Sequence, residues 1–317
     1  MPSLKWFISA AVCLLLLVAR AAHADYVLVS TQGTDLLLRF NLATGEASVV
    51  GQYDPGEGAA NLAVDASGSI YSSVFRGDKN IVKFVAPPGG GPLVTENFTP
   101  TVGGFGPGQI AFHDGDLYAA GDADDVIHQY DGQTGAEIRT FSSSTSFNIR
   151  AMTIAADFLY YAEIFQDRVH RFDLTQSPPA GGLFFQDAAN LSEPLGMTIG
   201  HNGNLVFVGR DTPLIQEFDI DTGTFAGTIA DLSTFAPGVA GGGDISYSAR
   251  LNDYFVTAND AVYRFDPSGQ LVRTYTSPLM PVAAGVLVVV PEPVTGTIVL
   301  LLVLTATAAT LAGRRAE

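Results

Sequence analysis

The sequence predicts an all-β fold: a six-bladed β-propeller closed by a C-terminal strand and followed by one transmembrane helix. Hairpins of alternating apolar and polar residues repeat along the chain, a pattern typical of propellers and solenoids. The composition agrees, because the 317 residues include 34 glycines and only 15% charged residues, whereas a helical protein needs more Glu, Lys and Arg. An uncharged stretch near the C-terminus predicts the membrane helix.

The clearest repeat is the hairpin LIQEFDIDTGTFAGTI at 214–229, in which an Asp/Gly turn joins two alternating strands. A second pair of strands precedes most such hairpins, as in GMTIGHNGNLVFVG at 196–209. Each unit therefore has four strands, and four strands per roughly 40–50 residues indicate a propeller blade. An aromatic residue ends the third strand of each unit: Phe40, Phe84, Tyr130, Phe172, Phe218 and Phe265.

The two ends of the repeat region predict how the ring closes. The first unit begins at its second strand, near Tyr26, and lacks an innermost strand. The last unit is complete at Tyr275, yet PVAAGVLVVV follows at 281–290. Pairing this segment with the first unit closes a ring of six blades and leaves no open sheet edge. An elongated solenoid, in which the ends stay apart, is the alternative.

The N-terminus predicts export. Residues 1–24 combine Lys5, an apolar run and small residues before a cleavage site, which is the pattern of a secretory signal peptide. An uncleaved membrane anchor is the alternative. The predicted cleavage precedes Asp25 and is specified by Ala22, Ala24 and Asp25. The only cysteine, Cys13, lies within the signal, so the predicted body at 25–290 has no disulfide and no cysteine metal site.

The C-terminal segment predicts attachment to a membrane. Residues 294–312 contain no charge, and a helix of about 20 apolar residues spans a bilayer. Two arginines follow, and positive charge favours the cytoplasmic side, so we expect the body outside and the C-terminus inside. Segment 291–317 begins with Pro-Glu-Pro, continues with the uncharged stretch and contains the two arginines near its end. It resembles the PEP-CTERM sorting signal of bacterial envelopes. The residues of this signal are Pro291, Glu292, Pro293, Arg314 and Arg315.

The sorting resemblance implies recognition and processing by an exosortase, a membrane-embedded protease, in a bacterium that makes extracellular polysaccharide. An ordinary C-terminal anchor is the alternative. Without Lys5, Arg20, the two C-terminal arginines, Glu292 and Glu317, the body keeps 12 of the 16 basic and 30 of the 32 acidic residues, a net charge of −18. Such a charge repels phosphate backbones and excludes nucleic acid as a partner.

The repeat pattern of the body resembles the NHL and SMP-30/gluconolactonase-like propellers, whose units read as an apolar strand, DxxGNLYV and xVxxFD…G. The lactonase resemblance implies a divalent metal at the mouth of the central tunnel, held by carboxylate and Asn oxygens. Four such residues lie at the expected starts of innermost strands, and an arginine that would repel a cation lies at the same level. These candidate ligand or metal residues are Asn61, Asn148, Arg150, Glu193 and Asp244.

Long connections are expected on one face of the ring, at 91–108, 142–149, 186–195 and 230–243, and long loops commonly carry binding sites. Their aromatic residues either stack on a ligand such as a sugar or only pin the loops. These aromatics are Phe98, Phe105, Phe147 and Phe235. A weaker calcium candidate is the acidic group Asp122, Asp124 and Asp125, for which a solvated turn is the alternative.

No catalytic residue is predicted. His113 and His201 fall on the face opposite the expected mouth, and His128 and His170 are interpreted as strand residues. The sequence therefore predicts an exported, envelope-anchored or exosortase-processed module that binds without catalysis in an exopolysaccharide or biofilm matrix. Its predicted partners are an exosortase, extracellular polysaccharide and, through the C-terminal helix, the membrane. The alternative function is a metal-dependent lactone hydrolase.

Overall fold

A computed structural model describes residues 25–74, 76–77, 80–100, 106–121, 124–143 and 148–289. Tyr26–Val289 forms one compact unit built almost entirely of strands, with a single 3-10 turn, η1 (Leu232–Thr234), among the described residues. No helix in these ranges is long and apolar enough to cross a membrane. The predicted signal peptide, Pro-Glu-Pro motif and membrane helix lie outside the described residues.

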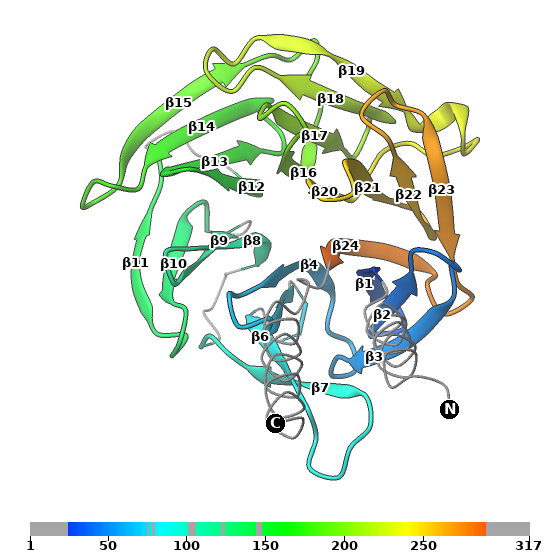
Figure 1. Cartoon of the computed structure of the whole chain (residues 1–317). Helices are drawn as coiled ribbons and strands as arrows, with labels where there is room; N and C mark the ends of the chain where they lie inside the picture. Colours follow the sequence, from blue (N-terminus) through cyan, green and yellow to red (C-terminus); the bar gives the residue numbers. More distant parts are fainter. Residues whose placement is uncertain are drawn as a thin grey trace, which may run out of the picture. The chain divides into compact units, whose positions relative to one another are not determined.

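The strands are arranged around a ring in consecutive groups of four, each running from the centre to the rim (Figure 1). Within each group, antiparallel pairing joins neighbouring strands. From the centre outward the groups are β24 (Val282–Val289), β1 (Tyr26–Gln32), β2 (Leu36–Asn41), β3 (Ala47–Gln52); β4 (Ala59–Val64), β5 (Ile70–Val74), β6 (Ile81–Val85), β7 (Leu93–Asn97); β8 (Pro107–His113), β9 (Asp116–Gly121), β10 (Ile127–Asp131), β11 (Glu137–Phe141); β12 (Ile149–Ala155), β13 (Phe158–Glu163), β14 (Arg168–Asp173), β15 (Ala180–Gln186); β16 (Pro194–Ile199), β17 (Leu205–Gly209), β18 (Leu214–Phe218), β19 (Phe225–Asp231); and β20 (Asp244–Ser248), β21 (Asp253–Ala258), β22 (Ala261–Phe265), β23 (Leu271–Thr276).

The count of separate sheets differs from the prediction of six blades. The described residues form four four-stranded sheets and one eight-stranded sheet, of order β24-β1-β2-β3-β7-β6-β5-β4. In the large sheet the outer strands β3 and β7 pair in parallel, Gly51 with Leu93 and Gln52 with Val94. A Cβ on Gly51 would lie 2.8 Å from the Phe84 ring. Glycine therefore permits the close approach that joins two four-stranded halves.

Closure by the C-terminal strand is confirmed. β24 pairs antiparallel with β1, with Val289 opposite Tyr26 and Val282 opposite Gln32. Val27 and Val286 are buried together in one cluster that also reaches the β20–β23 sheet. Because strands with one buried face are fixed in register by their apolar side chains, these valines specify the pairing. The first and last residues of the compact unit are therefore neighbours.

Hydrophobic clusters hold neighbouring groups together. The described residues contain six such clusters, each formed by side chains of two adjacent groups. The aromatic residues at the ends of the third strands are all buried, from Phe40, Phe218 and Phe265 at 0% exposure to Phe84 at 5%. Their regular recurrence in the sequence thus reflects one repeated packing position between the groups.

Deleting residues 282–289 is expected to abolish cooperative unfolding of the body, because β1 would lose its ladder partner and the Val286 cluster would be exposed. Deleting residues 291–317 removes none of these contacts and serves as the control. Scanning calorimetry and near-UV circular dichroism measure the outcome. A sharp melting transition near that of the parent after loss of 282–289 would show that closure is not needed for the fold.

Candidate functional site

Three polar side chains fill the centre of the ring. The six innermost strands carry either a polar or a small residue at the equivalent position. The polar residues, which we call the central plug, are Asn61, Gln109 and Asp244, and the small residues are Ala151, Gly196 and Gly285. Asn61, Gln109 and Asp244 are exposed by only 5%, 7% and 2%. Buried polar groups need partners, and the plug residues find them in one another and in the strands.

Asp244 is the centre of this network and accepts four hydrogen bonds. Asn61 Nδ2 donates to its Oδ2 at 2.8 Å, and Gln109 Nε2 donates to its Oδ1 at 2.8 Å. The backbone N–H groups of Val286 and Ile245 donate at 2.9 Å each. Burial raises the pKa of Asp244 to about 7, although the four donors act in the opposite direction.

Gln109 bonds two of the three innermost strands that carry no plug residue, and Asp244 bonds the third, β24, through Val286. Gln109 Oε1 accepts the backbone N–H of Met152 at 2.8 Å and of Met197 at 2.9 Å, and its Nε2 donates to the Met197 carbonyl at 3.3 Å. Asn61 Oδ1 accepts the N–H of Ile110 at 3.1 Å. The plug thus bonds to all six innermost strands: β4, β8, β12, β16, β20 and β24.

The small residues make this arrangement possible. A Cβ on Gly285 would lie 2.8 Å from Asn61 Cα, and a Cβ on Gly196 would lie 2.8 Å from Asp244 Cα. Real Cβ atoms do not approach other atoms so closely, so these two positions require glycine. Three of the innermost strands therefore supply the plug side chains, and the other three supply the space that these side chains fill.

A shallow depression of about 440 Å³, which we call the mouth, lies over the plug. Its floor includes Ala60 and Gly243, each one residue before a plug residue, and Ala284, next to Gly285. Its charged lining residues are Arg150 and Arg210. The mouth lies on the face where the innermost strands begin, which is the face expected from the sequence.

Arg210 is held in place from two sides. It forms an ion pair with Glu193, and its guanidinium lies 5.4 Å above the ring of Phe165. Phe165 is 48% exposed. The predicted ligand Glu193 therefore positions a cation at the mouth, and its charge is balanced by Arg210.

Of the other predicted ligand residues, Arg150 lines the mouth, and Asn61 and Asp244 belong to the plug beneath it. Asn148 is not among the lining residues. The N–H of Asn148 donates to Asp125 Oδ1 at 2.5 Å, whereas Asp124 Oδ2 is bonded to His128 Nε2 at 2.9 Å. These two carboxylates thus have different partners, and the calcium site predicted from Asp122, Asp124 and Asp125 stays a prediction. Asp122 lies outside the described residues, as do Phe105 and Phe147.

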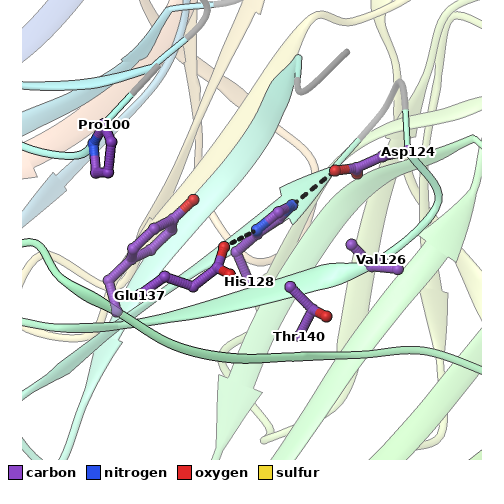
Figure 2. Close-up of a pocket in the computed structure, with 7 residues that line it drawn as sticks. Pro100, Asp124, Val126, His128, Glu137 and Thr140 are labelled. Carbon is purple, nitrogen blue, oxygen red and sulfur yellow. Dashed lines mark hydrogen bonds and ion pairs between the residues drawn. The ribbon is translucent and has the colours of Figure 1, made fainter. Parts of the chain in front are cut away.

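His128 is a feature that the sequence interpretation missed. Its ring is only 2% exposed and is bonded on both sides, Nε2 to Asp124 and Nδ1 to Glu137 Oε2 at 2.8 Å (Figure 2). Burial disfavours the charged ring, but these hydrogen bonds outweigh it, so the pKa of His128 is raised above its ordinary value. The hairpin of β10 and β11 was the available signal, since it places Glu137 opposite Tyr130, two residues from His128 along the same strand.

The other three histidines of the described residues also have partners away from the mouth. His170 lies 2.9 Å from Glu163, and both are fully buried. His201 Nδ1 lies 2.9 Å from the Tyr254 hydroxyl. His113 Nε2 lies 3.6 Å from a carboxylate oxygen of Asp114 and 3.6 Å from one of Asp157. Among the described residues, these three have potential ligand atoms close enough together to hold a metal ion. Both aspartates are exposed, and nothing else there indicates an ion.

Two of the predicted loop aromatics pin their loops. Phe98 packs edge-on against Tyr71 with ring centroids 4.9 Å apart. Phe235 packs edge-on against Phe265 at 5.4 Å. Such pairs are favourable beyond their buried area. Phe98 and Phe235 therefore fix their loops against strand aromatics.

No protein-family profile and no curated protein matches the chain. Solved structures are similar in fold. The nidogen/laminin complex matches with 16% identity and a TM-score of 0.64, over 83% of this chain and 97% of that one. A catalytically inactive virginiamycin B lyase from Staphylococcus aureus, with quinupristin, matches with 11% identity and a TM-score of 0.53, over 71% and 72% of the two chains. A putative 6-phosphogluconolactonase from Bacteroides uniformis matches with 17% identity and a TM-score of 0.54, over 80% and 83%.

The strand order and these matches show that the chain has an all-β, propeller-like fold. These three similar structures are a binding complex, a lyase and a putative lactonase, and identities this low show the fold alone. Function must therefore be argued from the plug, the mouth and the His128 site.

Replacing Asp244 by Asn is expected to lower the free energy of unfolding by about 3 kcal/mol or more. The new amide NH₂ group would face N–H groups that now donate hydrogen bonds to a carboxylate oxygen. The exposed Asp260→Asn change is the control and is expected to stay within about 0.5 kcal/mol of the parent. Urea denaturation measures both. Parent-like stability of D244N would mean that the plug contributes little.

Replacing His128 by Gln is expected to change the pH dependence of stability. A raised pKa means that the stabilisation from the imidazolium is complete below its ordinary pKa of about 6.5 and is lost as the pH rises through the raised value. The melting temperature of H128Q should therefore fall below that of the parent more at about pH 6 than at about pH 9. His113→Gln is the control, and an equal deficit at both pH values would contradict the charge assignment.

Proposed function

We propose that this protein is an exported propeller, anchored at a bacterial envelope or processed by an exosortase, that binds extracellular matrix material without catalysis. The N-terminal signal pattern and the PEP-CTERM-like tail support the address. The observation that carries the binding role is the satisfied plug beneath the mouth: Asp244 already accepts four hydrogen bonds from the protein. Because the plug oxygens are already occupied, the mouth would bind a ligand through the side chains that line it.

The metal-dependent hydrolase is less well supported. A hard divalent cation needs several oxygen ligands with free lone pairs. In the plug, both carboxylate oxygens of Asp244 and the amide oxygen of Asn61 are engaged by protein donors. Glu193 is engaged by Arg210. The proposed ligand set therefore does not fit the metal, and no hydrolytic step is derived from it.

The mouth and the ends of the described body lie on opposite faces of the ring. The innermost strands run from the mouth, where Val282 lies in its lining, to the opposite face, where Val289 pairs with Tyr26. The first and last strands of the body therefore leave the mouth free, which supports its proposed role as a contact surface.

The charge of the mouth favours an anionic ligand. Arg150 and Arg210 are two of the only 12 basic residues in a body of net charge −18. Arg210 is stacked on the half-exposed Phe165, an arrangement that presents an aromatic face and a guanidinium together. Carboxylate-bearing sugars offer both a flat apolar ring face and a negative charge. We therefore expect an extracellular polysaccharide that carries carboxylate groups at intervals along its chain, because the acidic body would repel a densely charged polyanion such as nucleic acid.

The test is binding of the producing organism's acidic polysaccharide by isothermal titration calorimetry. The double substitution R150A/R210A is expected to weaken binding at least about tenfold, since it removes both mouth cations. The double substitution R39A/K83A removes two cations elsewhere and should leave affinity nearly unchanged. Equal losses in both variants would indicate non-specific charge attraction.

Metal analysis and a lactone-hydrolysis screen address the alternative. We expect no stoichiometric divalent metal in the purified protein and no turnover. Stoichiometric metal together with hydrolysis that D244N abolishes would overturn the non-catalytic proposal.

A further inference from the structure

A second pocket lies away from the mouth, beside β10 and β11 (Figure 2). It has a volume of about 460 Å³. We call it the His128 pocket, and its lining residues are Pro100, Asp124, Val126, His128, Tyr130, Glu137 and Thr140. Neither the mouth nor the plug shares a residue with it, so its role is independent of the proposed function.

The pocket is acidic. Its lining contains two carboxylates, Asp124 and Glu137, and neither lysine nor arginine. Each carboxylate uses one oxygen to bond the His128 ring, and these bonds lie on opposite sides of the imidazole. Even when His128 is protonated, the pocket keeps one net negative charge. Its electrostatic preference is therefore for a cation.

Two buried polar atoms of the pocket are without partners among the described residues. They are Asp124 Oδ1 and the hydroxyl of Tyr130. Tyr130 is fully buried, and burial raises its pKa, which keeps the hydroxyl neutral. Its ring is stacked on His128 with centroids 5.8 Å apart and planes 8° apart. Unpaired buried polar atoms are rare in folded proteins and indicate a missing partner.

We propose that the His128 pocket binds a primary alkylammonium group, such as the end of a lysine side chain. An ammonium carries three N–H donors, which suit the unpaired oxygen of Asp124 and the hydroxyl of Tyr130, each able to accept a hydrogen bond. The alkyl stem would pack on the apolar walls formed by Pro100, Val126 and the Thr140 methyl group.

A metal ion fits the same residues less well. Both imidazole nitrogens of His128 are bonded to carboxylates, so the ring has no free nitrogen to offer as a ligand. Hard cations need six or more oxygen ligands, and the apolar walls supply none. The chemistry of the pocket thus selects an organic cation.

The test is titration of the full-length protein with n-butylammonium and with Nα-acetyl-lysine methylamide, monitored by calorimetry. Both are expected to bind, and Asp124→Asn is expected to weaken both at least about tenfold. Asp260→Asn serves as the charge control and is expected to bind like the parent. Absence of binding in the parent, or equal weakening by D260N, would overturn the proposal.

Tyr130→Phe distinguishes ligand binding from a structural role. It removes an unpaired buried hydroxyl, so the free protein is expected to melt at the same temperature as the parent or higher, whereas affinity for butylammonium falls several-fold. Tyr263→Phe, in the equivalent strand of another sheet, is the matched control. Unchanged affinity in Y130F would overturn the assignment of the hydroxyl, and binding of glucosamine or calcium in place of butylammonium would overturn the alkylammonium class.

Discussion

The unpaired inner edges of the six innermost strands are the constraint on which this structure depends. Each such strand is paired with a neighbour on one side only, so backbone N–H groups on its other edge point toward the axis without a strand partner. The side-chain oxygens of Asn61, Gln109 and Asp244 accept hydrogen bonds from these N–H groups and so link one strand to the next. One small network of three side chains therefore fixes the spacing of all the innermost strands and closes the ring at its centre.

The same network decides what the central face can do. Because the plug uses its oxygens internally, the space above it is a shallow mouth whose chemistry comes from Arg150 and Arg210. The chain enters and leaves the ring on the opposite face, where Tyr26 and Val289 are paired.

Much of the architecture was predictable because it follows from local patterns. The alternating hairpins and the recurring aromatic, from Phe40 to Phe265, predicted four-stranded units and their buried packing positions. Closure by 281–290 followed from a missing and a surplus strand. The junction of β3 with β7 was not predictable, because it depends on the close approach allowed by Gly51. Gln109 was overlooked, although the aligned repeats place it at the position of Asn61 and Asp244.

The sequence by itself determined the repeat, the closing strand and the acidic charge of the body, since periodicity and composition act through local propensity and simple electrostatics. Only the tertiary structure decided the partners of the polar residues. Asn61 and Asp244 are 183 positions apart and meet through the ring, and the bulged register of β10 with β11 brings Glu137 to His128. The first contact depends on how strands from distant repeats converge, and no local pattern encodes that geometry. The second depends on a bulge within one hairpin, which the alternating pattern of its two strands does not specify.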